Sequence, residues 1–494
     1  MSPRPLSLAD PEACAILRKV LADADYTHDG LTRALGLSTY ASAALTEFPV
    51  LLKALAPGTP LSILIQVFLL GYPVDVAAIE PVIRPLTPER LEALGVIMIE
   101  SGSVLPQVRL RLYRGYLFAA DRRPKEIKDI TPDFVLEINP TSAHVADITP
   151  RRRVASALDI GSGSGVLSIL AAAHCDKVVA TDINPRALNF TAFNAQLNGV
   201  SNIECLQGSL LDPVAGRTFD LVMSNPPFVI SPDTDYQFRD SGWARDGFCR
   251  ELVRRIPAHL NEGGIGLLLC DWPLRKGEVW SAVAAEWVAG SGCDSVVFRT
   301  KTQTTFEYAT NWNRPQLSSQ PKVYEAALER WVEYLRKLEI ESIASGRIIL
   351  RRRASEKPWM FTVDDAEKWS PTSGEHLLRI IEGRDWITSG VGPEDLLKSV
   401  FRPSDDLRME QTLEFQDEGM APVAMWASLA GGFHLRGKID TLVWHVLLLC
   451  DGRRPLREIV NELVEMSGKG SEILNPRVVA AVRDLYAAGF LIRV

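Results

Sequence analysis

The stretch VASALDIGSGSGVLSIL, residues 154–170, decides the fold of this chain. It begins as an apolar run of strand length, passes through the glycines at 161, 163 and 165, and continues as an apolar helix. Glycine permits a tight turn and lets backbone amides approach a bound ligand closely. A strand, a glycine loop and a helix in this order predict one unit of a parallel α/β sheet.

The same alternation continues on the carboxyl side of the glycine loop. Helices are predicted over 185–199 and 321–340, and strands over 154–160, 177–182, 203–209, 219–224, 264–271, 294–301 and 345–353. This pattern predicts a Rossmann-like α/β domain over residues 125–353 with a seven-stranded, mostly parallel sheet.

Asp182 ends the strand that follows the glycine loop. A carboxylate at this position can accept hydrogen bonds from the two ribose hydroxyls of a nucleotide. The glycine order is G-x-G-x-G, whereas nicotinamide dinucleotide sites have G-x-G-x-x-G, and Val166 stands where the last glycine would be. The loop also lacks the G-K-[ST] of nucleoside triphosphate sites. A plain β–α turn without a ligand is the remaining alternative.

The strand over 219–224 runs into the motif SNPPF, residues 224–228, whose two prolines end it. Because ligands of open α/β sheets bind at the carboxyl ends of the strands, we expect Asn225 on the rim of the cleft. The Asn225 side-chain oxygen and the Pro226 carbonyl can accept two hydrogen bonds, and Phe228 offers a flat face. This set suits a planar amino or amide nitrogen. A proline-terminated strand without chemistry is the alternative.

Together, LDIGSGSG, ATDINPRAL and SNPPF resemble the class I S-adenosylmethionine-dependent methyltransferases with an NPPF motif, similar to release-factor glutamine and rRNA guanine N-methyltransferases. The resemblance covers about residues 130–353. It implies an enzyme that uses S-adenosylmethionine, releases S-adenosylhomocysteine and has Asn225, Pro226 and Phe228 as catalytic residues. The cofactor-binding residues that it implies are Thr141, Asp159, Gly161, Gly163, Gly165, Asp182, Ile183, Asn184, Ser209, Leu210 and Asn225. Many relatives have an acidic residue where Ser209 or Leu210 stands.

The segment over 231–249 is long for a loop, polar and aromatic, and it follows the motif directly. Long loops beside a cleft are often lids or acceptor-binding segments. The acceptor-binding residues that we expect are Pro227, Tyr236, Arg239, Asp240, Trp243, Arg245 and Trp272. A solvated loop whose aromatic residues pack on the sheet edge is the alternative. No C-x-x-C pair or Cys/His cluster has metal-ligand spacing, so no metal site is predicted.

The flanking regions predict further domains. Residues 1–124 form an N-terminal helical, winged-helix-like domain, residues 354–432 a linker and accessory segment, and residues 433–494 a C-terminal winged-helix-like domain. The last of these contains a CDG turn at 450–452, the helix sequence LREIV at 456–460 and the terminal pattern L-x-x-x-G-F-L at 485–491. With these motifs it resembles the peptide-binding protein of pyrroloquinoline quinone biosynthesis, which implies recognition of a peptide as an added strand. The whole arrangement resembles large actinobacterial methyltransferases with extensions at both ends.

Composition narrows the partners. The net charge of −7 does not favour a protein that coats nucleic acid by bulk electrostatics. The seven scattered cysteines fit the reducing cytoplasm. The longest apolar run, 61–74, is shorter than the roughly 20 residues of a membrane span, and the N-terminus lacks a signal-peptide pattern. We therefore expect N-methylation of a peptide or protein. RNA or DNA amino groups, a small natural product and a non-catalytic binding module are the alternatives, and the oligomeric state is open.

Overall fold

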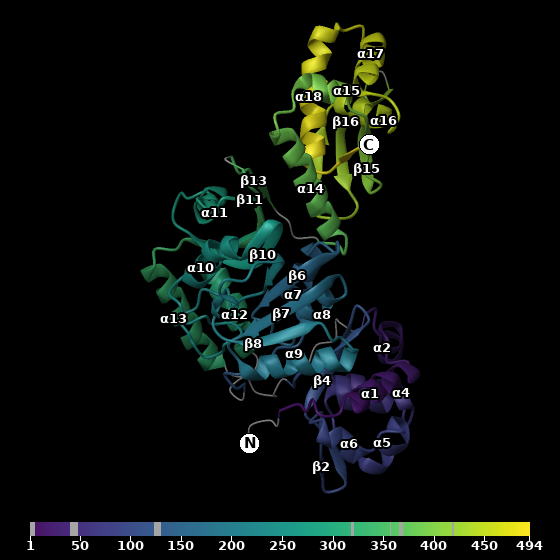
Figure 1. Ribbon diagram of the computed structural model, residues 1–494, viewed down its shortest axis with the longest axis vertical. Coiled ribbons are helices and arrows are strands. Elements are labelled where there is room, and N and C mark those ends of the chain that lie inside the picture. Colours follow the sequence, from purple (N-terminus) through teal and green to yellow (C-terminus); the bar gives the residue numbers. More distant parts are fainter. Residues whose placement is uncertain are drawn as a thin grey trace. The chain divides into compact units, whose positions relative to one another are not determined.

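The computed structural model describes residues 5–39, 48–122, 130–317, 321–355, 357–364, 369–416 and 419–494. The chain folds into two compact units (Figure 1). Unit 1 consists of Met1–Val145 and Arg153–Thr362, and unit 2 of Ala146–Arg152 and Val363–Val494.

Unit 1 is built on an eight-stranded sheet with the order β13-β11-β12-β10-β9-β6-β7-β8. The strands are β6 (Val154–Ile160), β7 (Cys175–Asp182), β8 (Ile203–Gln207), β9 (Phe219–Ser224), β10 (Leu260–Leu274), β11 (Cys293–Thr304), β12 (Ser342–Arg352) and β13 (Met360–Val363). Neighbours from β10 to β8 run parallel, whereas β12 is antiparallel to both β10 and β11. The predicted Rossmann-like fold is confirmed. The sheet has one strand more than the predicted seven, because β13 lies beside β11.

Helices follow the strands as in a parallel α/β fold. They are α8 (Val166–Ala172), α9 (Pro185–Asn198), α10 (Gly247–Arg255), α11 (Trp280–Val288), α12 (Thr305–Leu317) and α13 (Pro321–Lys337). Helix α7 (Pro140–Ile148) precedes β6, and its residues from Ala146 onward belong to unit 2. Helix α9 begins after the N-cap Asn184, whose side chain accepts from the Arg186 amide, and ends at Gly199 with φ 69°. The chain runs outward from β6 to β8 and then returns to β9. The carboxyl ends of β6 and β9 therefore meet at a topological switch point, where ligands bind in open α/β sheets.

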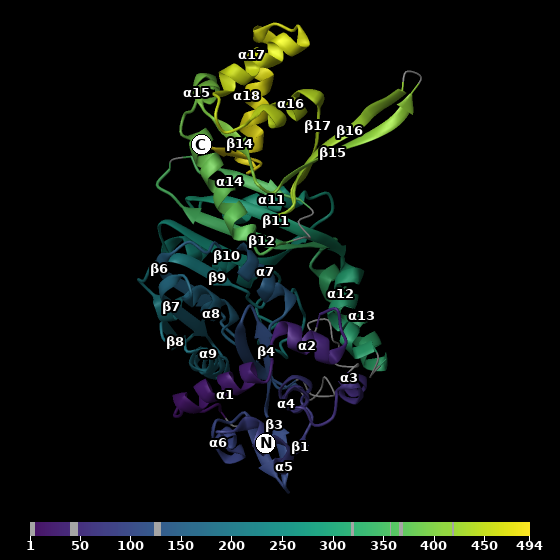
Figure 2. The ribbon, with the colours of Figure 1, turned by 90° about the vertical axis from the view of Figure 1, so that its right-hand side faces the viewer.

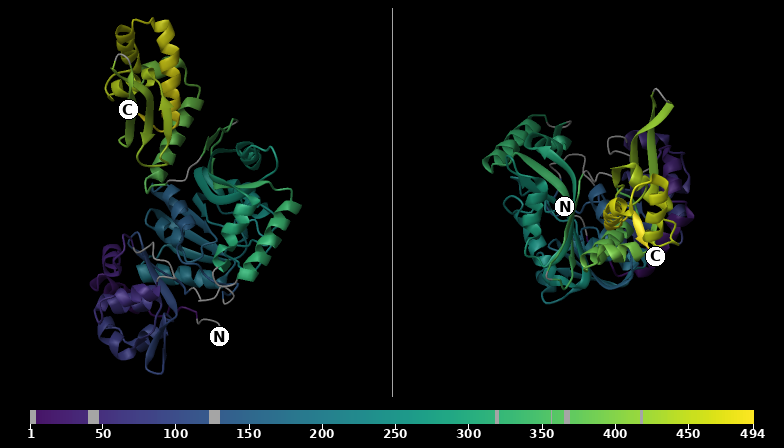
Figure 3. Two further views of the ribbon diagram at one scale, coloured as in Figure 1. Left: turned by 180° about the vertical axis from the view of Figure 1, so that it is seen from behind. Right: turned by 90° about the horizontal axis from the view of Figure 1, so that it is seen from above.

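The N-terminal part of unit 1 is helical and packs against α9. Its helices are α1 (Pro11–Asp23), α2 (His28–Leu35), α3 (Phe48–Ala54), α4 (Pro60–Leu64), a π-helix (Ile65–Leu70), α5 (Val76–Ile83) and α6 (Pro88–Ala93). Its strands are β1 (Val74–Asp75), β2 (Ile97–Glu100), β3 (Ser103–Pro106), β4 (Val108–Tyr113) and β5 (Tyr116–Asp121). Asn189 of α9 hydrogen-bonds both the amide and the carbonyl of Leu6. One apolar core joins Leu17 of α1 to Phe193 of α9. Figures 1 and 3 show these helices and α12–α13 on different sides of the sheet.

The long apolar run of the N-terminal region lies in this core. Val67 and Phe68 of the π-helix are fully buried in it. In the part of the chain that the structure describes, no helix combines the length and hydropathy that a membrane span requires.

Unit 2 combines helices with two small antiparallel sheets. Its elements are α14 (Ser373–Thr388), α15 (Pro393–Lys398), β14 (Phe401–Pro403), β15 (Leu407–Gln416), β16 (Gly419–Leu429), β17 (Arg436–Ile439), α16 (Thr441–Leu449), α17 (Leu456–Ser467), α18 (Ser471–Ala487) and β18 (Leu491–Arg493). Strands β15 and β16 form a long hairpin (Figure 2), and β14 pairs with β18. A single core contains Phe401, Leu456 and Val478. The winged-helix likeness of both end regions stays a prediction.

Candidate active site

A cavity of about 640 Å³ opens in unit 1 at the carboxyl ends of β6, β7 and β9. Its walls come from the glycine loop, the NPPF motif, residues 134–142 and the loop after the motif. This is the switch point of the sheet, so the cavity lies where the topology predicts a ligand.

The glycine loop has a backbone that favours glycine. Gly161, Gly163 and Gly165 have φ angles of 74°, 55° and 78°. The position of Gly165 has a second constraint, because a Cβ there would lie 2.9 Å from Cγ2 of Thr191. The Gly161 amide donates to the carbonyl of Thr181 over 2.8 Å, which fixes the loop against the end of β7.

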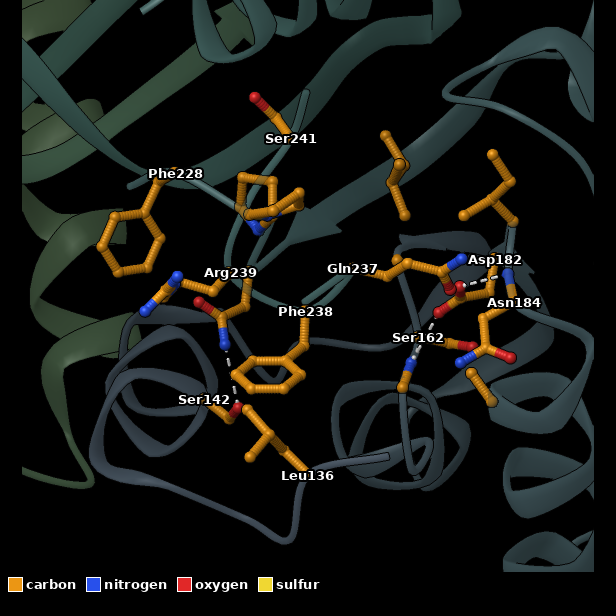
Figure 4. Close-up of a pocket in the computed structure, with 18 of the residues that line it drawn as sticks. Leu136, Ser142, Ser162, Asp182, Asn184, Phe228, Gln237, Phe238, Arg239 and Ser241 are labelled. Carbon is orange, nitrogen blue, oxygen red and sulfur yellow. Dashed lines mark hydrogen bonds between the residues drawn. The ribbon is translucent and has the colours of Figure 1, made fainter. Parts of the chain in front are cut away.

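Asp182 organises the same end of the cavity. Its Oδ2 accepts from the Gly163 amide and its Oδ1 from the Asn184 amide, both over 2.9 Å (Figure 4). Burial raises the pKa of Asp182 above its usual range, and these backbone hydrogen bonds oppose the rise. Each carboxylate oxygen keeps lone-pair capacity for ligand hydroxyls. Ile183, 59% exposed, adds an apolar surface to the wall.

Asp159 is a buried carboxylate with one unused oxygen. Its Oδ2 accepts from the amide and the hydroxyl of Ser168, over 3.0 and 2.6 Å. Its Oδ1 is buried and has no hydrogen-bond partner among the described residues. Burial raises the pKa of Asp159 to about 7, and the negative charge of Asp182 acts in the same direction. A cation such as a ligand ammonium group would compensate this carboxylate.

Asn225 at the start of the NPPF motif is held by its amide nitrogen. Its Nδ2 donates to Oγ1 of Thr141 over 3.2 Å and to Oγ of Ser142 over 3.0 Å (Figure 4). Both hydroxyls donate in turn to Oδ1 of Asn139. With Nδ2 engaged, the side-chain oxygen is the free end. Asn225 Oδ1 is buried and has no partner in the described part of the chain, so it is available to accept from a ligand N–H.

Aromatic rings form the wall beyond the motif. Phe228 meets Trp312 of α12 edge to face, with ring centroids 5.9 Å apart, and both line the cavity. Figure 4 shows Gln237 and Phe238 projecting into the cavity from the loop after the motif. The Phe238 ring stacks on Tyr236 at 5.5 Å. The wall is thus apolar where it faces away from the carboxylates.

Arg239 in the same loop is a buried cation with fixed partners. Its Nε and Nη2 donate to the two carboxylate oxygens of Asp240, over 2.7 and 2.9 Å. Asp233 lies 3.5 Å from Nη2, and the guanidinium stacks over Tyr236 and Trp331. These contacts make the loop an ordered wall.

The structure brings most of the predicted site residues to this one cavity. They are Thr141, Asp159, Gly161, Gly163, Asp182, Ile183, Asn184, Ser209, Leu210, Asn225, Pro226, Pro227, Phe228, Arg239, Asp240 and Trp243.

Four predicted residues do not line the cavity. Gly165 is the N-cap of α8, and Tyr236 stands behind Phe238. Arg245 lines a separate cavity of about 370 Å³. Trp272 is fully buried against Trp287 in the core between the sheet and α11, because its position in β10 directs it away from the cleft. Trp272 is therefore a core residue in this structure.

Sequence reasoning missed several cavity residues. Trp312, Gln237 and Phe238 line the cavity, and Asn139 supports the hydroxyls that hold Asn225. Gln237 and Phe238 lie inside the loop that was predicted to be functional. Trp312 lies 84 positions beyond Phe228 of the motif, and no local pattern links the two. Within the described ranges, no group of three or more His, Cys, Asp or Glu residues is placed to hold a metal ion.

Comparison with known proteins identifies two regions. Residues 137–269 match the family model of the methyltransferase small domain. Residues 23–107 match a domain of unknown function, DUF7059.

Three curated relatives share the first region. The release factor glutamine methyltransferase of Geobacter sulfurreducens is 30% identical over 149 residues, 27% of this chain and 52% of that protein. A putative protein N5-glutamine methyltransferase of Methanocaldococcus jannaschii is 35% identical over 122 residues, 23% of this chain and 59% of that protein. The ribosomal protein uL3 glutamine methyltransferase of Xanthomonas campestris is 33% identical over 133 residues, 24% of this chain and 42% of that protein. The chain thus spans about half the length of these relatives.

The match covers the glycine loop, Asp182 and the NPPF motif in the order in which they surround the cavity. Residues 137–269 are therefore a methyltransferase domain of the class I, S-adenosylmethionine-dependent kind, similar to that of the release factor glutamine methyltransferases.

Proposed function

We propose that this protein transfers a methyl group from S-adenosylmethionine to the side-chain amide nitrogen of a glutamine in a protein acceptor. The observation that carries the proposal is the orientation of Asn225, whose Nδ2 is held by two hydroxyls while its buried Oδ1 is free. Relatives that are named protein glutamine methyltransferases support the choice of acceptor.

The residues of the cavity fit S-adenosylmethionine. Asp182 would accept from the ribose hydroxyls, and Ile183 with Asn184, Ser209 and Leu210 would lie by the adenine. The glycine loop would follow the methionine part, with the unpaired Oδ1 of Asp159 near its ammonium group. The bound cofactor supplies an electrophilic methyl group on a sulfonium and leaves as S-adenosylhomocysteine.

The residues of this chain align the nucleophile. The lone pair of an amide nitrogen is delocalised, so its orientation must be fixed for an in-line displacement. Asn225 Oδ1 and the Pro226 carbonyl would each accept one N–H of the acceptor NH₂ group. Two acceptors in fixed positions hold the amide plane and stabilise the positive charge that develops on nitrogen. After the N–C bond forms and the C–S bond breaks, the nitrogen releases one proton to solvent, which leaves the neutral N-methyl amide. Phe228 and Trp312 supply an apolar wall that excludes water.

The remaining regions would select the acceptor. We propose that residues 433–494 recognise a peptide segment of the protein acceptor, in the manner of the added strand expected from the sequence. Residues 1–124 and 354–432 flank the methyltransferase domain of residues 125–353 in this scheme. A reaction on translation-related proteins would take place in the cytoplasm.

The experiment is a methyl-transfer assay with the purified full-length chain. Labelled S-adenosylmethionine is supplied with a purified peptide-chain release factor, with ribosomal protein uL3, or with bulk RNA or DNA. Methylated glutamine, located by mass spectrometry as a gain of one methyl on the side-chain amide, is the expected result.

Two comparisons make the assay decisive. Asn225→Ala should lower the initial rate of labelling by about 10²-fold, whereas Asn311→Ala, the same substitution at an exposed position of α12, should leave it unchanged. Label in RNA or DNA with none in protein would replace the proposal by amino-group methylation of nucleic acid.

A further inference from the structure

The backbone from the prolines of the NPPF motif to the second residue after the motif makes almost no hydrogen bonds. Pro226 and Pro227 have no N–H, and the strand β9 ends before them at Ser224. Among the described residues, the backbone of 226–230 makes a single hydrogen bond, from the Ile230 amide to the hydroxyl of Tyr308 over 3.0 Å. We call residues 226–230 the NPPF rim. Its position depends on the side chain of Tyr308, which lies 78 residues beyond Ile230 in the chain.

The Tyr308 hydroxyl is itself oriented. Tyr308 is 1% exposed and donates its proton to Oδ2 of Asp271 over 2.7 Å. Because a hydroxyl has one proton, this donation leaves the Tyr308 oxygen as the acceptor for the Ile230 amide. Asp271 is also 1% exposed and belongs to β10, a central strand of the sheet. The rim is thus connected through Tyr308 to the rigid centre of the fold.

The same helix also holds the aromatic ring of the motif. Trp312 lies four residues after Tyr308 in α12, so both side chains lie on one helix face. The Trp312 ring contacts Phe228 at 5.9 Å and Tyr308 at 6.2 Å. Helix α12 therefore fixes the motif at two points, the backbone at Ile230 and the ring at Phe228.

We propose that Tyr308 is a positioning residue of the methyl-acceptor site, which holds the NPPF rim in register with the cofactor cleft through its hydrogen bond to the Ile230 amide. Tyr308 does not line the cavity, so it acts on the acceptor only through the rim. The proposal rests on the proposed N-methyltransferase function. It adds a residue that lies outside the motif and outside the matched family region.

The test is Tyr308→Phe, which removes the hydroxyl and keeps the ring in the aromatic cluster. Tyr486→Phe in unit 2 is the matched control, since Tyr486 is also buried, at 3% exposed. Three quantities are measured in the full-length chain: kcat on the acceptor, the cofactor Kd by calorimetry, and hydrogen exchange of the Ile230 amide.

A positioning role predicts a kcat at least about tenfold lower, since small displacements of aligned groups cost rates of this order. It also predicts faster exchange of the Ile230 amide and a cofactor Kd within error of the wild type. The Tm should fall, because the buried Asp271 carboxylate and the Ile230 amide each lose a hydrogen-bond partner. An unchanged kcat, or a loss of kcat matched by an equal loss of cofactor affinity, would overturn it. If the wild type methylates no acceptor at all, the proposed function fails. In that case the hydrogen-exchange rate of the Ile230 amide alone tests the positioning role. If the Ile230 amide is as well protected in Tyr308→Phe as in the wild type, the positioning role is wrong.

Discussion

At the scale of single residues, Asn225 is the side chain on which the proposed chemistry depends. Its amide nitrogen is fixed by Thr141 and Ser142 and its oxygen is free. Asn225→Ala should lower kcat by about 10²-fold, the effect of removing one preorganised polar group from a transition state. Calorimetry should find cofactor affinity far less affected, because the residues proposed to hold the ribose and the ammonium group remain. A variant with weak cofactor binding and normal turnover at saturation would contradict this role.

Asp182 should govern affinity rather than turnover. Asp182→Ala removes a charged acceptor from the end of the cavity where the ribose would bind, and it releases the amides of Gly163 and Asn184. Hydrogen bonds to charged groups contribute about 1.5–3 kcal/mol, so the cofactor Kd should rise roughly 10- to 100-fold. Asp182→Asn keeps one acceptor oxygen and should show a smaller rise. Calorimetry on the three proteins checks the order, and equal affinities would contradict it.

Asp159 should make stability depend on pH. Its pKa in the folded chain is about 7 against an ordinary value of 3.8, so the folded state binds the proton more tightly than the unfolded state. The free energy of unfolding should therefore fall as the pH rises from about 4 to about 7, by up to about 4 kcal/mol, and level off above.

Asp159→Asn is the control for this slope, because it keeps an acceptor for Ser168 and cannot ionise. Urea unfolding of both proteins at pH 5 and pH 8 measures the difference. If the free energy of unfolding had the same pH dependence in the wild type and in Asp159→Asn, titrating groups other than Asp159 would be responsible for it.

At the scale of elements, the regular sheet could be predicted and the irregular wall could not. The predicted strand at 219–224 and the helix start at Pro185 coincide with β9 and α9, because buried apolar runs and the Asn184 cap are local signals. The glycine loop and the NPPF motif were found for the same reason. Helix α12 was missed, since Trp312 reaches the site only through a tertiary contact with Phe228. Trp272 was misplaced because sequence does not show which face of β10 turns toward the core.

The wall over residues 133–136 depends on an ion pair from two other elements. Arg186 of α9 donates from both Nη atoms to Asp121 of β5, over 2.9 and 2.7 Å. Asp121 also accepts from the Val135 amide over 2.7 Å, and Val135 lines the cavity. The pair thus ties the cavity wall to the first turn of α9.

Removing the ion pair between Asp121 and Arg186 should destabilise the cavity wall around Val135. Asp121→Ala leaves the Arg186 guanidinium with only its longer contacts to Asp133, at 3.2 Å from the carbonyl and 3.6 Å from the carboxylate. Unfolding should therefore become easier by up to about 3 kcal/mol, and the cofactor Kd should rise. Asp23→Ala removes an exposed pair with Lys19 and should change the unfolding free energy by less than about 1 kcal/mol. Denaturant titration of both variants checks the contrast, and equal losses would contradict it.

At the scale of the whole molecule, the chain passes between its two units three times, after Val145, Arg152 and Thr362. No composition shift marks the first two crossings, so sequence inspection divided the chain only into consecutive segments. Residues 146–152 belong to unit 2, where Gly374 of α14 lies so close that a Cβ would be 2.5 Å from the Thr149 carbonyl oxygen. Gly374→Ala should therefore lower the Tm of unit 2, and calorimetric unfolding would measure the shift.

Residues 146–152 belong to unit 2 but lie between the two stretches of unit 1 in the sequence. This order suits the protein to fragment complementation, in which two separate chains reassemble. A polypeptide of residues 363–494 alone lacks one piece of its own unit, and that piece, with the buried Ile148, remains in residues 1–362. The two halves expressed as separate chains should reassociate, because residues 1–362 hold the segment that completes unit 2. In cells that express both halves, restored methylation would show that the split protein has assembled. The half that carries Gly374→Ala should reassemble less well.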